Sequence, residues 1–360
     1  MRHRVACVFT ATAMAACGGG GDGGSGDGSG GFDDRQIIVD FADQVVIPTY
    51  ELLDERSAGL DAAVGALAGA PTDENLDAAR QAWVDLRVPW EESEAFLFGP
   101  VESENWDPAM DTWPLNKDDL DNVLESSDEF TPDFIANLPD SQKGFHTVEY
   151  LLWGQEGEKT ADQLTERELD YLAALSQELT VVTANLATSW TDGEGGQAAY
   201  REVFTTAGES GNAFYPSLGS AAQEILDGMS GICDEVANGK IAAPFDARDP
   251  DLVESQYSFN SLPDFQDNMR SVLNAYTGDF PAGGTEGRGL DEYVAERDGA
   301  LDQRFRSELA GAIEALGAIP SPFREAITDA ENDTLIEGAQ QAIRTVQTTI
   351  DSDLTGVILE

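Results

Sequence analysis

Apolar residues recur at intervals of three and four along most of this chain, and this spacing constrains the fold more than any other feature. It places apolar side chains on one face of an α-helix, whereas a half-buried strand would alternate apolar and polar residues. Almost no alternating stretch is present. Eight segments show the helical spacing: 37–67, 74–98, 144–153, 166–190, 215–236, 265–276, 290–316 and 335–358. The sequence therefore predicts an all-α fold of helical bundles.

Short stretches rich in proline, glycine and polar residues separate these segments. They read GAPTDE, LPDSQKG, DGEGG, NGKIAAPFD and GDFPAGG, and each predicts a break between helices. A helix, a proline-containing turn and a second helix follow one another both at 53–83 and at 305–343, with leucine and alanine in similar register. We therefore expect two helical-bundle domains, residues 32–192 and 193–360, related by internal duplication.

The N-terminal residues 1–16 are typical of a bacterial secretory leader, with a basic start, an apolar run and small residues before Cys17. The ending MAAC resembles a lipobox, which predicts that Cys17 is lipidated; the alternative is a plain leader. Cys17 and the glycine-rich run that follows, residues 17–31, would form an anchored, flexible tether. We expect the protein on the extracytoplasmic or periplasmic face of the cell envelope, and on the outer membrane if the cell has one, because Gly18 follows the anchor.

The chain is strongly acidic, with a formal charge of −48. Nucleic acid would be repelled and is not expected as a partner, and the same holds for an anionic membrane surface. Only four of the twenty basic residues are lysines. This composition suggests a halophilic source, in which salt screens the repulsion between surface carboxylates. A cluster of acidic residues is therefore weak evidence for a metal site in this chain.

Cysteine usage excludes an intramolecular disulfide in the processed form. Cys7 leaves with the leader and Cys17 is the anchor candidate, so only Cys233 remains. Because Cys233 lies at helical spacing with Ile225 and Met229, we predict a buried apolar thiol.

One histidine, His146, would remain after removal of the leader, which contains His3. Glu149 follows it by three residues, so on a helix both side chains could reach one ion. Imidazole and carboxylate suit iron, zinc, copper or manganese, and a single nitrogen among oxygens favours a hard ion such as ferric iron. The alternative is a partly buried histidine satisfied by Glu149 or by a backbone carbonyl.

Several catalytic classes are excluded by their missing signatures. The sequence contains no HExxH, no GxSxG, no P-loop and no dinucleotide-binding fingerprint. Nucleophilic catalysis by serine or cysteine would depend on His146 as its base.

A second charged segment lies among tryptophans. Arg87, Glu91 and Glu94 are spaced four and three residues apart, so they share a helix face with Trp83. Pro89 predicts a kink or a break in this helix. The aromatic side chains could form a pocket wall or the core of a bundle.

Four motifs in order resemble the imelysin-like family, which includes iron-regulated protein A of cyanobacteria and periplasmic iron-binding components of uptake systems. The first is GxHxxE, present as Gly144, His146 and Glu149. The others are RVPWEESEAFLFGPV, DTWPLN and ESQYSFNSLPDFQDNMRSVLNAYTG. The resemblance extends from Ile37 to the C-terminus.

The resemblance implies two duplicated bundles with His146 and Glu149 as metal ligands near their interface. Further candidate ligands are Glu94 and Asp111, and the candidates that would orient or complete the site are Arg87, Gly144, Trp113, Glu254 and Ser255. It also implies iron, or another divalent metal, as the bound species and an iron-uptake protein of the membrane as a partner. We therefore expect a lipoprotein that binds iron or a small iron complex. The alternatives are an imelysin-type metallopeptidase and a helical module that binds a protein partner without metal.

Overall fold

The computed structural model describes residues 31–193 and 195–360, and the predicted leader, Cys17 and nearly all of the tether lie outside this part of the chain. The described residues form helices and no strands, with a single isolated bridge between Phe280 and Thr285. The predicted all-α class is confirmed.

Seventeen α-helices are described in these two ranges. They are α1 (Arg35–Asp40), α2 (Ile47–Gly69), α3 (Asp73–Glu91), α4 (Pro100–Ser103), α5 (Trp106–Asp111), α6 (Lys117–Glu125), α7 (Pro132–Ala136), α8 (Gly144–Trp153), α9 (Glu166–Thr191), α10 (Tyr200–Thr205), α11 (Leu218–Asp234), α12 (Ala242–Ala247), α13 (Ser261–Thr277), α14 (Leu290–Gly317), α15 (Phe323–Ala326), α16 (Asp333–Thr349) and α17 (Thr355–Leu359).

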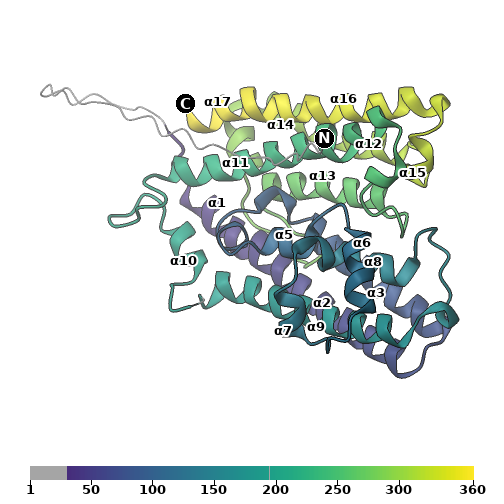
Figure 1. Cartoon of the computed structure of the whole chain (residues 1–360). Coiled ribbons are helices and arrows are strands. Elements are labelled where there is room, and N and C mark those ends of the chain that lie inside the picture. Colours follow the sequence, from purple (N-terminus) through teal and green to yellow (C-terminus); the bar gives the residue numbers. More distant parts are fainter. Residues whose placement is uncertain (1–30, 194) are drawn as a thin grey trace, which may run out of the picture.

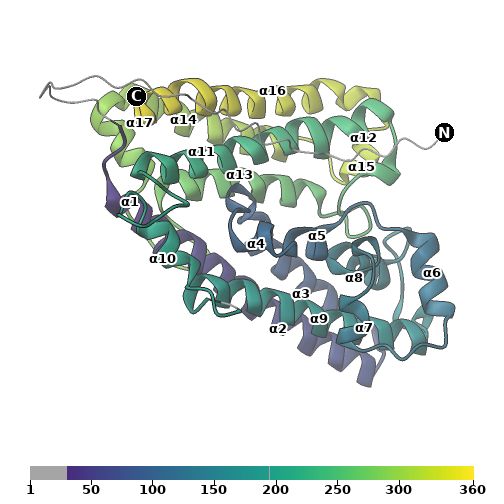
Figure 2. The ribbon, with the colours of Figure 1, turned by 60° about the vertical axis from the view of Figure 1, so that its left-hand side comes forward.

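The helices form two layers (Figure 1). In the lower layer of the view, α2 packs along both α3 and α9, and α8 lies against α3 and α9. In the upper layer, α11, α13, α14 and α16 pack in the same manner (Figure 2). Each long helix buries apolar residues at helical spacing, as Leu53, Leu60, Val64 and Leu67 do on α2. The buried apolar residues of both layers belong to one continuous core, and the duplication of the two bundles stays a prediction.

Three π-helical segments each join two consecutive α-helices without a break. They are η1 (Phe41–Val46), η5 (Glu235–Ile241) and η8 (Ile350–Leu354). The break predicted at NGKIAAPFD is wrong, because η5 and α12 keep this stretch helical. Pro89 lies in the last turn of α3, which ends at Glu91 and is followed by the 3-10 turn η2 (Glu94–Phe96). The other 3-10 turns are η3 (Asp140–Gln142), η4 (Ala161–Gln163), η6 (Pro250–Leu252) and η7 (Ala330–Asn332).

Two further predictions concern single features. Cys233 is a buried free thiol, as predicted, and burial raises its pKa above the usual value. Over the described residues, no helix combines the length and the apolar character that a membrane span needs.

Candidate metal centre

The glycine of the GxHxxE motif brings two helices into contact. Gly144 begins α8 at φ +75°, in the left-handed region that favours glycine. A Cβ atom there would collide with the carbonyl oxygen of Met110 in α5. Asp111 follows Met110 directly and His146 follows Gly144 by two residues, so this close approach brings Asp111 to the imidazole.

Replacing Gly144 with alanine is expected to destabilise the fold and move α5 away from α8. The positive φ alone costs about 1–3 kcal/mol, and the collision with Met110 adds to it. Gly311→Ala is the matched control, because Gly311 is exposed inside α14 and an added Cβ meets nothing within 4 Å. That control should gain about 0.5–1 kcal/mol. Urea unfolding at constant salt measures the stability of both variants. Equal stability would contradict the conclusion that the contact between α5 and α8 requires glycine at position 144.

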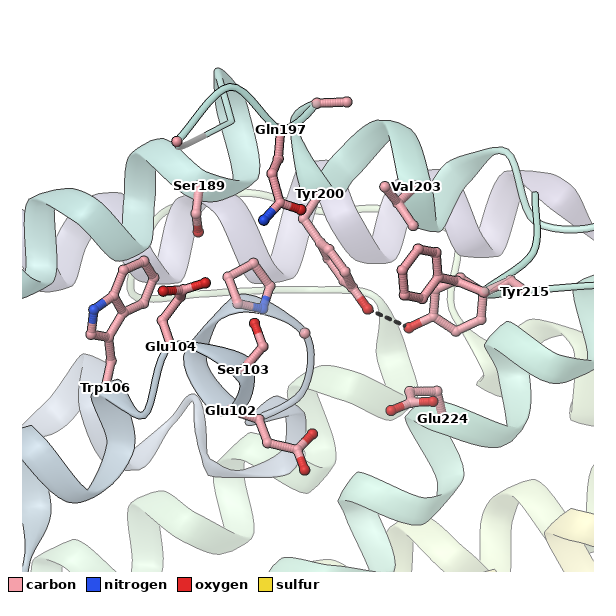
Figure 3. Close-up of a pocket in the computed structure, with 15 residues that line it drawn as sticks. Glu102, Ser103, Glu104, Trp106, Ser189, Gln197, Tyr200, Val203, Tyr215 and Glu224 are labelled. Atoms are coloured by element: carbon pink, nitrogen blue, oxygen red, sulfur yellow. Dashed lines mark hydrogen bonds between the residues drawn. The ribbon is translucent and has the colours of Figure 1, made fainter. Parts of the chain in front are cut away.

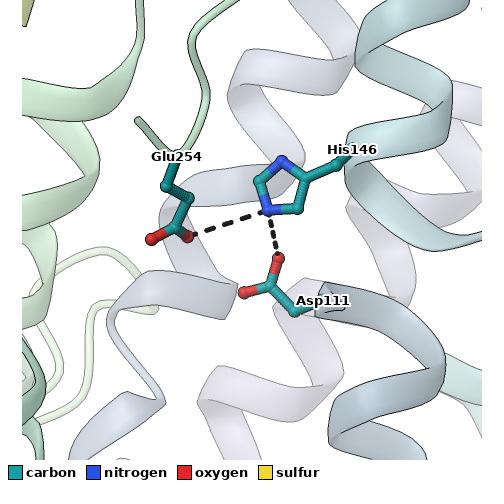
Figure 4. A group of neighbouring side chains, drawn as sticks. All are labelled: Asp111, His146 and Glu254. Carbon is teal, nitrogen blue, oxygen red and sulfur yellow. Dashed lines mark ion pairs between the residues drawn. The ribbon is translucent and has the colours of Figure 1, made fainter. Parts of the chain in front are cut away.

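The imidazole of His146 is buried, with 1% of its surface exposed, and each ring nitrogen faces carboxylates. Nδ1 lies 3.2 Å from Oε2 of Glu149. Nε2 lies 3.0 Å from Oδ1 of Asp111 and 3.8 Å from Oε1 of Glu254 (Figure 4). The contact with Asp111 lacks the angles of a hydrogen bond, and the contact with Glu254 is too long for one. Nε2 is therefore a buried nitrogen without a hydrogen-bond partner, aimed at two carboxylates.

The charge of this imidazole depends on its carboxylate neighbours. Burial by itself would lower the pKa of His146, but the contacts with Asp111 and Glu149 outweigh it and raise the pKa to about 9. In the protein without a bound cation, His146 is therefore protonated at neutral pH.

The motif glutamate, Glu149, connects the two layers. Its Oε1 accepts hydrogen bonds from the backbone N–H of Tyr257 (2.9 Å), from that of Ser258 (2.8 Å) and from the Ser258 hydroxyl (2.8 Å). Ser255 and Phe259 have positive φ in this turn, which lies next to Glu254. Glu149 therefore holds both the orientation of His146 and the turn that carries Glu254.

Arg87 lies at the centre of the site and is fully buried. Its Nη1 donates to Oδ1 of Asp111 at 2.6 Å, and its Nη2 donates to Glu91 and to Oε1 of Glu254 at 3.1 Å. Asp264 also lies within 3.4 Å of Nη2. Burial alone would raise the pKa of Asp111, but Arg87 and His146 hold it well below its usual range.

Carboxylates outnumber cations in this buried cluster. The six acids are Glu91, Glu94, Asp111, Glu149, Glu254 and Asp264, and the three bases are Arg87, His146 and Lys240. Burial raises the pKa of Asp264 to about 7 and that of Glu94 well above its usual value. The excess negative charge is balanced either by protons or by an added cation.

A cavity of about 440 Å³ leads to this cluster, and Asp111, Glu254 and Lys240 line it. Trp113 also lines it, with its ring 4.8 Å from the imidazole of His146 and its Nε1–H donating to the carbonyl of Leu252 at 3.1 Å. An ion that enters the cavity would meet the carboxylates of Asp111 and Glu254 in front of Nε2.

A second cavity, of about 570 Å³, lies elsewhere, beside α4, α5 and α10. Trp106, Glu102 and Glu224 line it with Tyr200 and Tyr215, whose hydroxyls are 2.7 Å apart (Figure 3). None of the site residues predicted from the sequence lines it, and its carboxylates form no group of possible metal ligands in the described part of the chain.

In the structure, the predicted site residues of the folded body all lie in one region. They do not all face the same ring nitrogen of His146. Asp111, His146 and Glu254 each offer a ligand atom within 4.8 Å of the others. Glu149 faces the opposite ring nitrogen, and Glu94 joins a second acidic group with Glu91 and Asp111.

Other predicted residues support the site. Ser255 donates from its hydroxyl to Asp264 at 2.5 Å, and Arg87, Gly144 and Trp113 take the positions described above. Sequence reasoning missed Asp264 and Lys240, and it named Glu91 only as a neighbour of Arg87. The scarcity of lysine was the one available signal, because Lys240 is one of four.

The sequence matches a known protein family over most of its length. The family model described as imelysin matches residues 46–350. The chain belongs to the imelysin family. The curated iron-regulated protein A of Synechococcus elongatus is 33% identical over 352 residues, which cover 98% of this chain and 92% of that protein.

Solved structures give the same picture of the imelysin fold. A crystal structure from Parabacteroides distasonis, assigned as an iron-regulated protein A precursor, has a TM-score of 0.81 and 27% identity, and the alignment covers 92% of this chain and 97% of that one. An imelysin-like protein from Psychrobacter arcticum has a TM-score of 0.73 and 14% identity over 91% of this chain and 98% of that one, which shows the shared fold.

The donor set of this imelysin-family protein fits a metal ion. Histidine ligands usually donate their second N–H to a carboxylate, which leaves the lone pair of the other nitrogen for the metal. Glu149 at Nδ1 and the unpartnered Nε2 of His146 have this arrangement. With Asp111 and Glu254 the set is one nitrogen and several oxygens, which suits iron or manganese.

Proposed function

We propose that this protein binds iron, as an ion or as a small complex, through Asp111, His146 and Glu254. The observation that carries the proposal is the buried Nε2 of His146, which has no hydrogen-bond partner and faces two carboxylates at the end of a cavity. Similarity to proteins described as iron-regulated favours iron among the metals that this donor set suits. Glu149 orients the imidazole in this proposal, and iron is cargo rather than a catalyst.

The geometry favours binding over peptide hydrolysis. A zinc hydrolase needs a general base next to an open metal position. Glu149 is the acidic residue of the motif, but its Oε1 accepts three hydrogen bonds and its Oε2 faces Nδ1. It is not free to activate a water molecule.

We further propose that the protein acts at the cell envelope, where lipidation of Cys17 would hold it and the tether would separate the body from the membrane. At the envelope, the protein would deliver iron to a partner protein in the membrane. Labelling with a fatty-acid analogue in a bacterial host, with Cys17→Ala as the control, tests the anchor.

Calorimetric titration of the metal-stripped protein at high salt tests the binding. We expect stoichiometric binding of ferrous or ferric iron, with a matching rise in thermal stability, because an ion that binds only the folded state stabilises it. His146→Ala should lose this binding. Equal binding by wild type and variant would contradict the proposal, and so would chelator-sensitive cleavage of an unfolded substrate as the main activity. A module that binds only a protein partner would bind no ion.

Metal affinity is expected to rise with pH. The pKa of His146 is about 9 in the metal-free protein, and only neutral imidazole binds a metal, so below that pH an ion must displace a proton. The apparent affinity should increase about tenfold per pH unit from pH 6 to 8 and release about one proton per ion. Titration of zinc in buffers of different ionisation enthalpy measures both quantities. A pH-independent affinity would show that Nε2 is not a ligand.

A further inference from the structure

Lys240 is a buried cation that the proposed iron site does not use. Its side chain is 7% exposed, and its Nζ lies 3.3 Å from Oε1 of Glu94 and 3.3 Å from both carboxylate oxygens of Glu254. Oε2 of Glu91 is 3.5 Å away. One ammonium group thus contacts three buried carboxylates, which come from α3, from η2 and from the segment between η6 and α13.

Two of these carboxylates belong to a second group of possible metal ligands. Glu91, Glu94 and Asp111 each offer an oxygen within 4.8 Å of the others, the same criterion that Asp111, His146 and Glu254 meet. The two groups share Asp111. A carboxylate shared between adjacent ligand groups is the arrangement that two-metal sites use to hold ions about 3.5–4 Å apart.

Lys240 lies on the Glu91 and Glu94 side of this second group, and Arg87 lies on its Glu91 and Asp111 side. On this basis, which rests on the proposed iron site, we propose that Lys240, beside Arg87, fills the open part of a second ion position and limits the centre to one ion. A lysine ammonium is a compact point charge with three donors and no acceptor, so it can neutralise these oxygens but cannot bridge to a metal. Its positive charge also opposes a second ion. With Lys240 in this position, the centre binds a single ion.

The backbone around Lys240 explains how its side chain reaches the cluster. Lys240 is the sixth residue of the π-helical segment η5, which continues α11 and is followed by α12. An inserted π turn shifts the residues that follow it around the helix axis, and such turns are frequent at functional sites. In an uninterrupted α-helix the residue at this position would point in another direction.

Metal counting in three variants tests this inference. Lys240→Met keeps the aliphatic length and removes the charge, Lys240→Arg keeps the charge, and Lys117→Met removes a charge from an exposed surface pair with Asp121. Each protein is saturated with zinc, and separately with ferrous iron without oxygen, at high salt. After desalting, bound metal is counted by mass spectrometry and compared with the calorimetric stoichiometry.

We expect one ion in the wild type, in Lys240→Arg and in Lys117→Met, and two ions in Lys240→Met. If the methionine variant does not fold, Lys240→Gln gives the same test, because its amide can donate to two of the carboxylates. If the wild type and the folded Lys240→Met or Lys240→Gln variant each bind one ion, the role of Lys240 is overturned, whereas the proposed iron site is not. Two ions in the wild type or in Lys117→Met would also overturn it. No bound ion in any of the proteins would overturn the proposed function as well.

Discussion

Replacing Arg87 with methionine is expected to cost about 3–5 kcal/mol of unfolding free energy, the usual cost of removing one partner from a buried ionic cluster. The fully buried guanidinium contacts Asp111, Glu91, Glu254 and Asp264, and no other cation among the described residues touches all four. Methionine fills a similar volume but leaves these carboxylates without their common partner. Urea unfolding at constant high salt measures the loss.

The matched control is Arg304→Met, which removes a half-exposed arginine paired with Asp353. An exposed pair contributes at most about 1 kcal/mol, so this variant should unfold close to the wild type. Equal losses in the two variants would show that the effect comes from net charge rather than from the buried cluster.

The pH dependence of the Arg87→Met deficit provides a second check. In the wild type the pKa of Asp111 is held below its usual range, so Asp111 contributes stability that is present above pH about 4 and is lost as pH falls. Without Arg87 the pKa of the same carboxyl rises, because only His146 and Lys240 then oppose the effect of burial, and the stability that Asp111 contributes above pH about 4 becomes smaller. The deficit should therefore be largest at neutral pH and should shrink only as the pH falls below about 4, toward the lowered pKa of Asp111 in the wild type.

The positions of the long helices were predictable because a long amphipathic helix repeats apolar residues at intervals of three and four in its sequence. The segments expected at 144–153 and 166–190 correspond to α8 and α9 within one residue at each end. Short elements such as α4 and α5 span only a turn or so and carry no period that a sequence could show. The π-helical segment η5 was taken for a break because Asn238 and Gly239 are common turn residues.

Most residues of the candidate site were predictable from the sequence, but Asp264, Lys240 and the geometry of the site were not. The motif placed His146 and Glu149 on one helix face, which the structure confirms. Which ring nitrogen Glu149 contacts depends on the turn at Tyr257 and Ser258, more than 100 residues away in the chain. Lys240 reaches the cluster only through the folded position of η5, and no spacing rule links it to Glu94.

Replacing Glu149 with glutamine is expected to lower metal affinity by about 10–100-fold, the usual effect of losing the carboxylate that orients a histidine ligand. The amide oxygen can keep the hydrogen bonds from Tyr257 and Ser258, but the amide N–H would donate to Nδ1 of His146. The imidazole proton would then favour Nε2, and the ion would have to displace it in order to bind. The loss of charge-assisted hydrogen bonds should also cost about 1–3 kcal/mol of stability. Glu156→Gln, at an exposed position after α8, is the control.

Hydrogen exchange in the wild type separates the orienting role of Glu149 from the role of ligand that the motif resemblance implies. If Glu149 bound iron through Oε1, it would have to release the N–H groups of Tyr257 and Ser258, because Oε1 already accepts from both. Their exchange would then become faster in the metal-loaded protein. An orienting glutamate keeps both hydrogen bonds, so exchange at these two amides should slow or stay unchanged as the loaded site stabilises the fold. Faster exchange would therefore assign Oε1 of Glu149 to the metal, whereas protected amides would mean that Oε1 still joins the two helical layers. The affinity loss in Glu149→Gln then reports on the contact of Oε2 with Nδ1 of His146.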